Sequence, residues 1–154
     1  MLATARKVLR DPDAAEDAVQ QTVILAWRYL PRLRDPGRFD GWMYKLLVSA
    51  CYQEARRARR HSRRVVANKK ELATDDDIEL WLTREALEQA FRALTPAHRA
   101  VVVLHHYVGL PLGEVAAIVG VSHGTARSRL HYAHQALRAV LEATDRALVV
   151  DTDR

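Results

Sequence analysis

Apolar residues recur every three or four positions along most of the chain, and proline, glycine and capping residues separate the periodic stretches. Residues 1–10 form the first stretch and read as a helix. The pair Asp11-Pro12 then places an acidic cap and a proline where a new helix begins. The pattern that follows predicts one amphipathic helix of about five turns, which ends at Pro31. Its expected buried stripe comprises Ala15, Val19, Thr22, Val23, Ala26 and Leu30.

A second long helix is predicted at residues 39–64, after a basic loop that contains two prolines and a glycine. Its apolar stripe comprises Phe39, Trp42, Met43, Leu46, Leu47 and Ala50. Beyond Glu54 the helix carries six arginines in nine positions, and like charges at this density repel one another unless an anion neutralises them. Arginines close to Tyr44, Tyr52 and other aromatic side chains are typical of proteins that bind single-stranded or flipped bases. A solvated arginine face, with Phe39 and Trp42 in the core, is the alternative.

The periodic pattern fails at residues 66–77, where Lys69-Lys70 give way to three consecutive aspartates, and this predicts a connector. The pattern resumes at Leu80, and Thr95-Pro96 begins a helix that ends near Gly109. Its apolar centre at residues 100–104 is also compatible with a buried strand. The Thr-Pro start, the length and the glycine stop favour a helix.

The most specific pattern lies at residues 111–138. A helix-turn-helix motif needs a small residue where the two helices cross, a turn residue that tolerates a left-handed backbone, and an apolar residue early in the second helix that packs back. Ala116, Gly120 and Ala126 have this spacing. The second helix, capped by Ser122, then presents side chains that contact phosphates and base edges, as recognition helices do in the major groove. An ordinary pair of packed helices with a basic face is the alternative.

These elements predict an all-α fold with two small helical domains rather than one core, joined by a linker, the second domain containing the helix-turn-helix. The expected boundaries are 1–65 for the first domain, 66–80 for the linker, 81–145 for the second domain and 146–154 for a tail. The net charge of +5 is uneven: it is +9 through residue 70, −6 over residues 71–90 and +2 beyond. This distribution favours two modules that contact nucleic acid at separate places.

The sequence does not support four other classes of protein: disulfide-bonded proteins, membrane proteins, enzymes and metal-binding proteins. The single cysteine, Cys51, forms no internal disulfide, and no uncharged run approaches the roughly 18 residues of a membrane span, so we expect a cytoplasmic protein without membrane insertion. No glycine-rich phosphate loop, catalytic carboxylate pair or nucleophile with a base is present, so we expect no enzyme. His131 and His134 lie one turn apart, near His105-His106, but adjacent histidines point to different helix faces. We therefore expect neither a metal nor a cofactor.

Taken together, these segments resemble conserved regions two and four of the extracytoplasmic-function (ECF) sigma factors, the small bacterial transcription initiation factors. The resemblance extends from Leu2 to about Glu142. It rests on the runs DAAEDAVQQTVILAWRYL, RDPGRFDGWMYKLLVSACYQEARRARR and LTPAHRAVVVLHHYVGLPLGEVAAIVGVSHGTARSRL. It implies a factor that directs core RNA polymerase to specific promoters and helps to open the minus-ten element.

The resemblance implies three contact surfaces. The surface for the polymerase core corresponds to Asp17, Gln20, Gln21 and Thr22, on the helix face away from the apolar stripe. The surface that opens the minus-ten element and holds an extruded base corresponds to Arg38, Phe39, Trp42, Lys45, Ser49, Gln53, Arg56 and Arg57. The reader of the minus-thirty-five element corresponds to Ser122, His123, Thr125, Arg127, Ser128, Arg129 and His131.

The implied partners are the RNA polymerase core, promoter DNA and an anti-sigma factor that inhibits the chain. A stand-alone dimeric helix-turn-helix regulator is the alternative function, and it would bind a palindromic duplex without polymerase. A metal sensor or small metalloenzyme built on the seven histidines is a further alternative.

Overall fold

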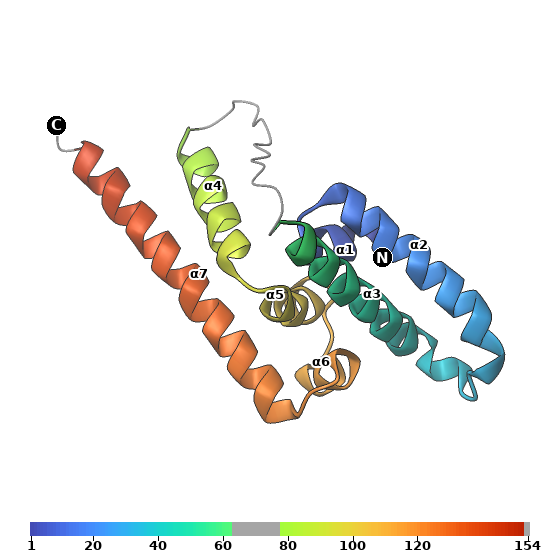
Figure 1. The fold of residues 1–154 in the computed structure, drawn as a ribbon. Helices are drawn as coiled ribbons and strands as arrows, with labels where there is room; N and C mark the ends of the chain where they lie inside the picture. Colours follow the sequence, from blue (N-terminus) through green and yellow to red (C-terminus); the bar gives the residue numbers. More distant parts are fainter. Residues whose placement is uncertain (63–77, 153–154) are drawn as a thin grey trace.

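The computed structural model describes the backbone of residues 1–62 and 78–152, and the side chains of residues 1–60 and 86–143. All regular elements in these ranges are helical, which confirms the all-α prediction (Figure 1). In chain order they are α1 (Leu2–Leu9), α2 (Pro12–Tyr29), α3 (Phe39–Ser62), α4 (Ile78–Ala93), α5 (Pro96–Val102), α6 (Leu112–Val119) and α7 (His123–Thr152). Two 3-10 turns, Leu30–Arg32 and Pro36–Arg38, join α2 to α3, and a π turn, Val103–Tyr107, extends α5. Within the described helices, none combines the length and apolar character that crossing a membrane requires.

Local capping signals begin two of these helices where the sequence predicts. The side chain of Asp11 accepts hydrogen bonds from the backbone N–H groups of Asp13 and Ala14, at 3.0 and 3.1 Å. The hydroxyl of Thr95 accepts one from the backbone N–H of His98, at 3.3 Å. These caps satisfy amide groups that have no partner within the first helical turn.

The buried face of α2 differs from the prediction. Ala15, Ala18 and Thr22 are buried, whereas Val23 is 56% exposed and Leu30 is 46% exposed. Small side chains on the buried face let α2 lie close to α3, and larger apolar side chains stay outside this contact. Helical spacing therefore predicts the helix correctly but misplaces part of its buried face.

The two predicted domains pack against each other through one contiguous core. Helix α1 lies against α5 and the π turn, and α3 lies against α5 and α6 (Figure 1). The first half contributes Ala5, Val8, Leu47 and Cys51 to this core, and the second half contributes Val101, Leu104, Val115 and Val119. The two halves therefore share a core in this conformation, a contact that the sequence analysis did not predict because periodicity along a helix carries no information about its distant neighbours.

The observed ends of the linker and the tail also differ in part from the predicted ones. Most of the expected linker at residues 66–80 lies outside the described residues, and α4 begins at Ile78. Helix α7 continues to Thr152, so most of the expected tail at residues 146–154 has a helical backbone. Helices α4 and α7 pack side by side (Figure 1). The boundaries of the two domains therefore stay a prediction.

A buried arginine connects the two halves. Arg99 is 8% exposed, and its Nε donates a hydrogen bond to the carbonyl oxygen of Val8 at 2.6 Å, while Nη1 donates to that of Phe91 at 3.4 Å. Val8 lies in the last turn of α1, where carbonyl groups lack a partner within the helix. Burial, followed by the charges of Arg10 and Arg59, lowers the pKa of Arg99 to about 10. The guanidinium therefore remains charged at neutral pH.

Two further contacts cross between the halves. Arg10, at the end of α1, forms an ion pair with Glu88 of α4. The ammonium group of Lys7 lies 4.6 Å from the ring centroid of Tyr107, which is within the range of a cation–π contact. Apolar packing, a buried cation and exposed polar contacts thus act at the same interface.

The helix-turn-helix is present as predicted. Helix α6 ends at Gly120, whose φ of 72° lies in the left-handed region. The backbone N–H groups of Gly120 and Val121 both donate to the carbonyl oxygen of Ala116. Ala116 is 4% exposed and Ala126 is fully buried, so small residues lie where α6 and α7 pack together.

Replacement of Arg99 by alanine should lower the free energy of unfolding by about 2–3 kcal/mol, because the carbonyl of Val8 loses a charge-assisted donor. Urea denaturation followed by circular dichroism measures the change. Arg92→Ala removes an exposed arginine of α4 and should change the stability by less than about 0.5 kcal/mol. Equal losses in the two variants would show that Arg99 has no special role at the interface.

Replacement of Gly120 by alanine should lower the free energy of unfolding by about 1 kcal/mol, because a Cβ atom disfavours the left-handed backbone. Gly113→Ala is the matched control, since it lies inside α6 and a Cβ there meets nothing within 4 Å. The control should raise the stability by up to about 1 kcal/mol, because alanine favours the helix. Thermal denaturation compares the two, and a Gly120→Ala protein as stable as the wild type contradicts this account of the turn.

Candidate nucleic-acid interface

One face of α3 carries a continuous row of side chains that begins with a tryptophan and continues with polar and basic residues. They follow one another at intervals of three or four residues, which places them on the same side of the helix. The row consists of Trp42, Lys45, Ser49, Gln53 and Arg56. Trp42 is half-buried and the others are exposed. The structure therefore brings together most of the residues that the sequence assigns to the minus-ten element.

Phe39 and Arg57 lie beside this row. The ring of Phe39 is 41% exposed and its centroid lies 5.9 Å from that of Trp42, so Phe39 is not a core residue. Arg57 Nη1 donates a hydrogen bond to Glu54 Oε1 at 2.6 Å. Because Glu54 is only 9% exposed, Arg57 neutralises a nearly buried carboxylate, a role that the sequence did not predict.

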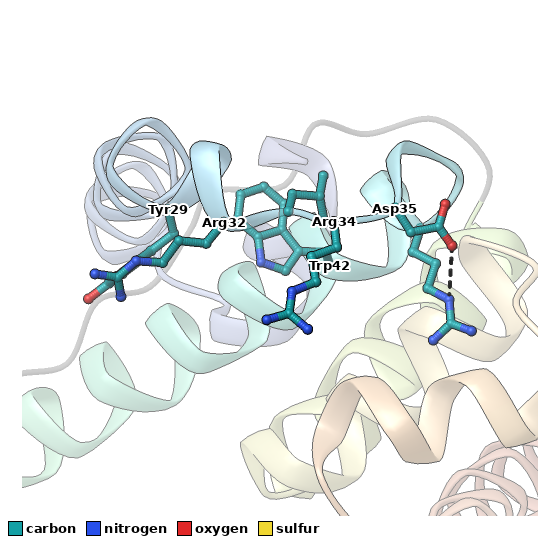
Figure 2. A pocket seen from close by; sticks show the side chains of 7 residues that line it. Tyr29, Arg32, Arg34, Asp35 and Trp42 are labelled. Carbon is teal, nitrogen blue, oxygen red and sulfur yellow. Dashed lines mark ion pairs between the residues drawn. The ribbon is translucent and has the colours of Figure 1, made fainter.

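A cavity of about 670 Å³ lies at the start of this row, between the end of α2 and the start of α3. Its lining consists of Tyr29, Arg32, Leu33, Arg34, Asp35, Arg38 and Trp42. Figure 2 shows Trp42 between Tyr29 at one end of the lining and Asp35 at the other. The volume is within the usual range for small-ligand pockets. The lining combines two aromatic rings with three arginines and one aspartate, so its net charge is positive.

Asp35 shapes the loop beside the cavity. Its Oδ1 accepts a hydrogen bond from the backbone N–H of Gly37 at 3.0 Å, and its Oδ2 lies 3.3 Å from Nε of Arg38. Arg32 and Arg34 were absent from the sequence-based set of contact residues. Two prolines and three arginines in residues 31–38 were the signal that could have identified them.

The recognition helix begins with a cap and an exposed polar face. Ser122 Oγ accepts a hydrogen bond from the backbone N–H of Thr125 at 3.1 Å and lies 2.9 Å from its hydroxyl. Ser128 Oγ donates to the carbonyl oxygen of Thr125 at 3.1 Å. The predicted contact residues that are exposed here are Ser122, His123, Thr125, Arg127, Ser128 and His131.

Arg129 differs from the rest of the predicted face. It is half-buried and lines a cavity together with Tyr52 and Arg56 of α3. Burial raises the pKa of Tyr52, and the positive charge of Arg129 partly opposes this rise. In this conformation Arg129 thus faces the first half of the chain rather than the exposed face of α7.

The predicted surface for the polymerase core requires one correction. Asp17 and Gln20 are exposed and Gln21 is half-buried, but Thr22 is fully buried and its hydroxyl donates to the carbonyl oxygen of Ala18 at 2.7 Å. Thr22 is therefore no part of this surface, because it lies on the face of α2 that packs against the core.

An exposed apolar patch continues the same face of α2. Trp27 is 83% exposed, Val23 is 56% exposed and Ile24 is 47% exposed. Exposed apolar side chains of this size often mark protein–protein contacts. The sequence interpretation missed this patch because it assigned Val23 to the buried stripe and gave Ile24 and Trp27 no role. Val23 and Trp27 follow Gln20 by three and seven positions, which places them on the same face of the helix as Gln20. This spacing was the signal that could have identified the patch.

Three of the described histidines lie in contact: the ring centroid of His106 is 4.7 Å from that of His105 and 5.0 Å from that of His134. The Nε2 atoms of His106 and His134 lie 2.8 Å apart, so one ring can donate a hydrogen bond to the other. His105 Nδ1 lies 2.8 Å from the carbonyl oxygen of Leu110. In the described part of the chain, no group of three or more histidine, cysteine, aspartate or glutamate residues is arranged to hold a metal ion.

Comparison with known proteins identifies both halves of the chain. The family model for sigma-70 region 2 matches residues 1–61, and the model for sigma-70 region 4 matches residues 90–139. The ECF RNA polymerase sigma factor SigL of Mycobacterium tuberculosis is 33% identical over 144 residues, which are 90% of this chain and 80% of that protein. The RNA polymerase sigma factor CarQ of Myxococcus xanthus is 34% identical over 142 residues, which are 88% of this chain and 79% of that protein.

A solved structure has a similar fold. It is the sigma factor RpoE of Bartonella quintana in complex with the anti-sigma factor NepR, and it is 24% identical to this chain with a TM-score of 0.69. The similarity covers 92% of this chain and 89% of that one. With both conserved regions matched in order, this chain belongs to the ECF family of RNA polymerase sigma factors.

Proposed function

We propose that this chain binds the RNA polymerase core, directs it to specific promoters and helps to open the minus-ten element. The proposal rests on one observation: this chain, a member of the family, exposes two separate polar surfaces. One is the row on α3 that leads to the cavity beside Trp42. The other is the exposed amino-terminal face of α7.

The α3 surface suits the capture of an unpaired base. Arg32 and Arg34, both exposed, would attract backbone phosphates, and the indole of Trp42 offers a surface on which a base can stack. Stacking of this kind is worth about 1–3 kcal/mol per base, which is comparable to the few kcal/mol needed to take a base out of the duplex. The site can therefore hold separated strands without a chemical step.

The α7 surface suits the reading of duplex DNA. The first turns of a recognition helix lie in the major groove, and here they expose His123, Thr125 and Arg127. Arginine can donate two hydrogen bonds to the edge of guanine, and hydroxyl groups bind phosphate oxygens. This surface would fix the position of the polymerase relative to the minus-thirty-five element.

The face of α2 suits docking of the polymerase core. Asp17 and Gln20 lie exposed on the same helix as Val23, Ile24 and Trp27. An exposed tryptophan surrounded by apolar and polar side chains is the typical centre of a protein–protein interface. We infer that Trp27, rather than Thr22, supplies most of the contact from this helix.

The same function implies the remaining properties of the chain. It acts in the cytoplasm with the polymerase, an anti-sigma factor serves as its inhibitor, and the polymerase performs the chemistry. Burial raises the pKa of the Cys51 thiol to about 12 and keeps it protonated, so this cysteine does not act as a nucleophile at neutral pH.

Run-off transcription with purified bacterial core polymerase and a library of promoter fragments tests the proposal. We expect new start sites only when the chain is added. Trp27→Ala should weaken binding to the core by about tenfold or more, because it removes the centre of the docking surface. Trp42→Ala should leave this affinity within about twofold but reduce promoter opening by about tenfold, since one stacked base is lost.

Leu87→Ala is the control for both variants, because it removes another exposed apolar side chain, on α4. It should change neither core binding nor promoter opening. The proposal fails if the chain does not bind the core and yields no new start sites. Tight binding of the chain alone to a palindromic duplex would then support the dimeric regulator.

A further inference from the structure

A groove runs between the two halves of the chain, beside their shared core, and has a volume of about 400 Å³. Tyr52, Ala55, Arg56 and Arg59 line it from α3. The second half contributes Thr95, Pro96, Ala97, Val119 and Arg129. We refer to it below as the inter-half groove. It exists only when the two halves are packed together, because each half supplies one wall.

The charged residues that line the inter-half groove are all cationic. Arg56, Arg59 and Arg129 are among its lining residues, and the lining contains no carboxylate. None of the three forms an ion pair within the described part of the chain. Arg56 and Arg59 are exposed and Arg129 is half-buried, so solvent screens part of their mutual repulsion, and an anion between them would remove the rest.

Neighbouring cavities differ in this respect. Arg59 also lines a second cavity that contains Arg92 and Arg99, but the lining of that cavity includes Asp11 and Glu54. The cavity beside α1 combines its basic residues with Asp11 and Glu88. Carboxylates thus offset the arginines in both neighbours. The inter-half groove has the same type of basic lining without this compensation.

Tyr52 gives a second, independent indication of a missing ligand. Its hydroxyl oxygen is buried and has no hydrogen-bond partner among the described residues. Buried tyrosine hydroxyl groups nearly always have a partner. Burial raises the pKa of this hydroxyl, so it stays protonated and can donate a hydrogen bond to an anion.

The rest of the lining is apolar. Ala55, Pro96, Ala97 and Val119 supply it, together with the ring of Tyr52. Small-molecule pockets typically have volumes of about 300–1,000 Å³ and combine apolar walls with a few polar groups that fix the orientation of the ligand. Inorganic phosphate alone would leave the apolar wall unused.

We propose that the inter-half groove binds a phosphate-bearing small molecule with an organic body, of the size of a mononucleotide. The guanidinium groups of Arg56, Arg59 and Arg129 hold the phosphates, and a small shift of the side chains around the buried Tyr52 hydroxyl lets it donate one further hydrogen bond. The organic body lies against the apolar wall. Because both halves contribute, the ligand binds only the packed form and shifts the equilibrium toward it.

The existence of this site does not depend on the proposed function, but its consequence does. Arg56 and Arg129 also belong to the surfaces assigned to promoter DNA. A ligand in the inter-half groove would therefore compete with DNA for these two arginines. Occupation of the groove would reduce promoter binding by holding both arginines inside the molecule.

Isothermal titration of the full chain with ATP, at roughly physiological ionic strength, tests the proposal. We expect saturable binding of one ATP per chain and no binding of adenosine. Arg59→Ala, outside the set of predicted DNA contacts, should weaken the binding of ATP by about tenfold or more. Tyr52→Phe should weaken it by about threefold or more, because it removes only the hydroxyl.

Arg60→Ala is the matched control, because Arg60 is an exposed arginine of α3 that does not line the groove. It should change ATP binding by less than about twofold. Circular dichroism establishes that each variant is folded. The proposal is overturned if ATP does not bind saturably, if Arg59→Ala and Arg60→Ala weaken binding equally, or if only DNA binds. Binding of the chain to core polymerase, measured without any nucleotide, reports on the proposed function separately.

Discussion

The packing of α1 and α3 against α5 and α6 is the contact on which the rest of the structure depends. Helix α1 has eight residues and α5 has seven, and helices of this length are not stable in water without tertiary contacts. Ala5 and Val8 of α1 are buried in the same cluster as Val101 and Leu104 of the second half. Each half thus completes the core of the other. The arrangement places the row on α3 and the recognition helix in fixed positions relative to one another.

The chemistry of this interface suits a contact that can separate. Arg99 is buried among apolar side chains but bonds to carbonyl groups rather than to a carboxylate, and the ion pair of Arg10 with Glu88 lies at the edge. A buried cation without a counter-charge carries a desolvation penalty that an apolar residue would not. A partner that binds the separated halves more tightly can therefore shift the equilibrium. The Trp42 cavity and most of the α7 face stay accessible in the packed form, whereas Arg56 and Arg129 share the inter-half groove.

Features encoded by a few neighbouring residues could be predicted from the sequence. Asp11 before Pro12 predicts the start of α2, and Gly120 between Ala116 and Ala126 predicts the turn, because each acts through local backbone geometry. Burial was harder to predict. Thr22 and Val23 are adjacent in α2, yet one is fully buried and the other is mostly exposed, since the small side chains of this helix pack on α3. The exposure of Trp27 and the inward position of Arg129 depend on contacts between residues far apart in the sequence, which periodicity does not report. The individual promoter and polymerase contacts stay predictions, because they involve molecules outside the chain.

The most direct test of this account is the distance between the two halves in solution. Spin labels on cysteines introduced at Asp13 and Gln135, both exposed, report this distance by pulsed electron paramagnetic resonance. The native Cys51 is 1% exposed and its thiol stays protonated, so it does not interfere. The account predicts a single narrow distribution for the free chain, and a longer distance after addition of the polymerase core. A broad distribution for the free chain, typical of two modules joined only by a linker, would contradict it.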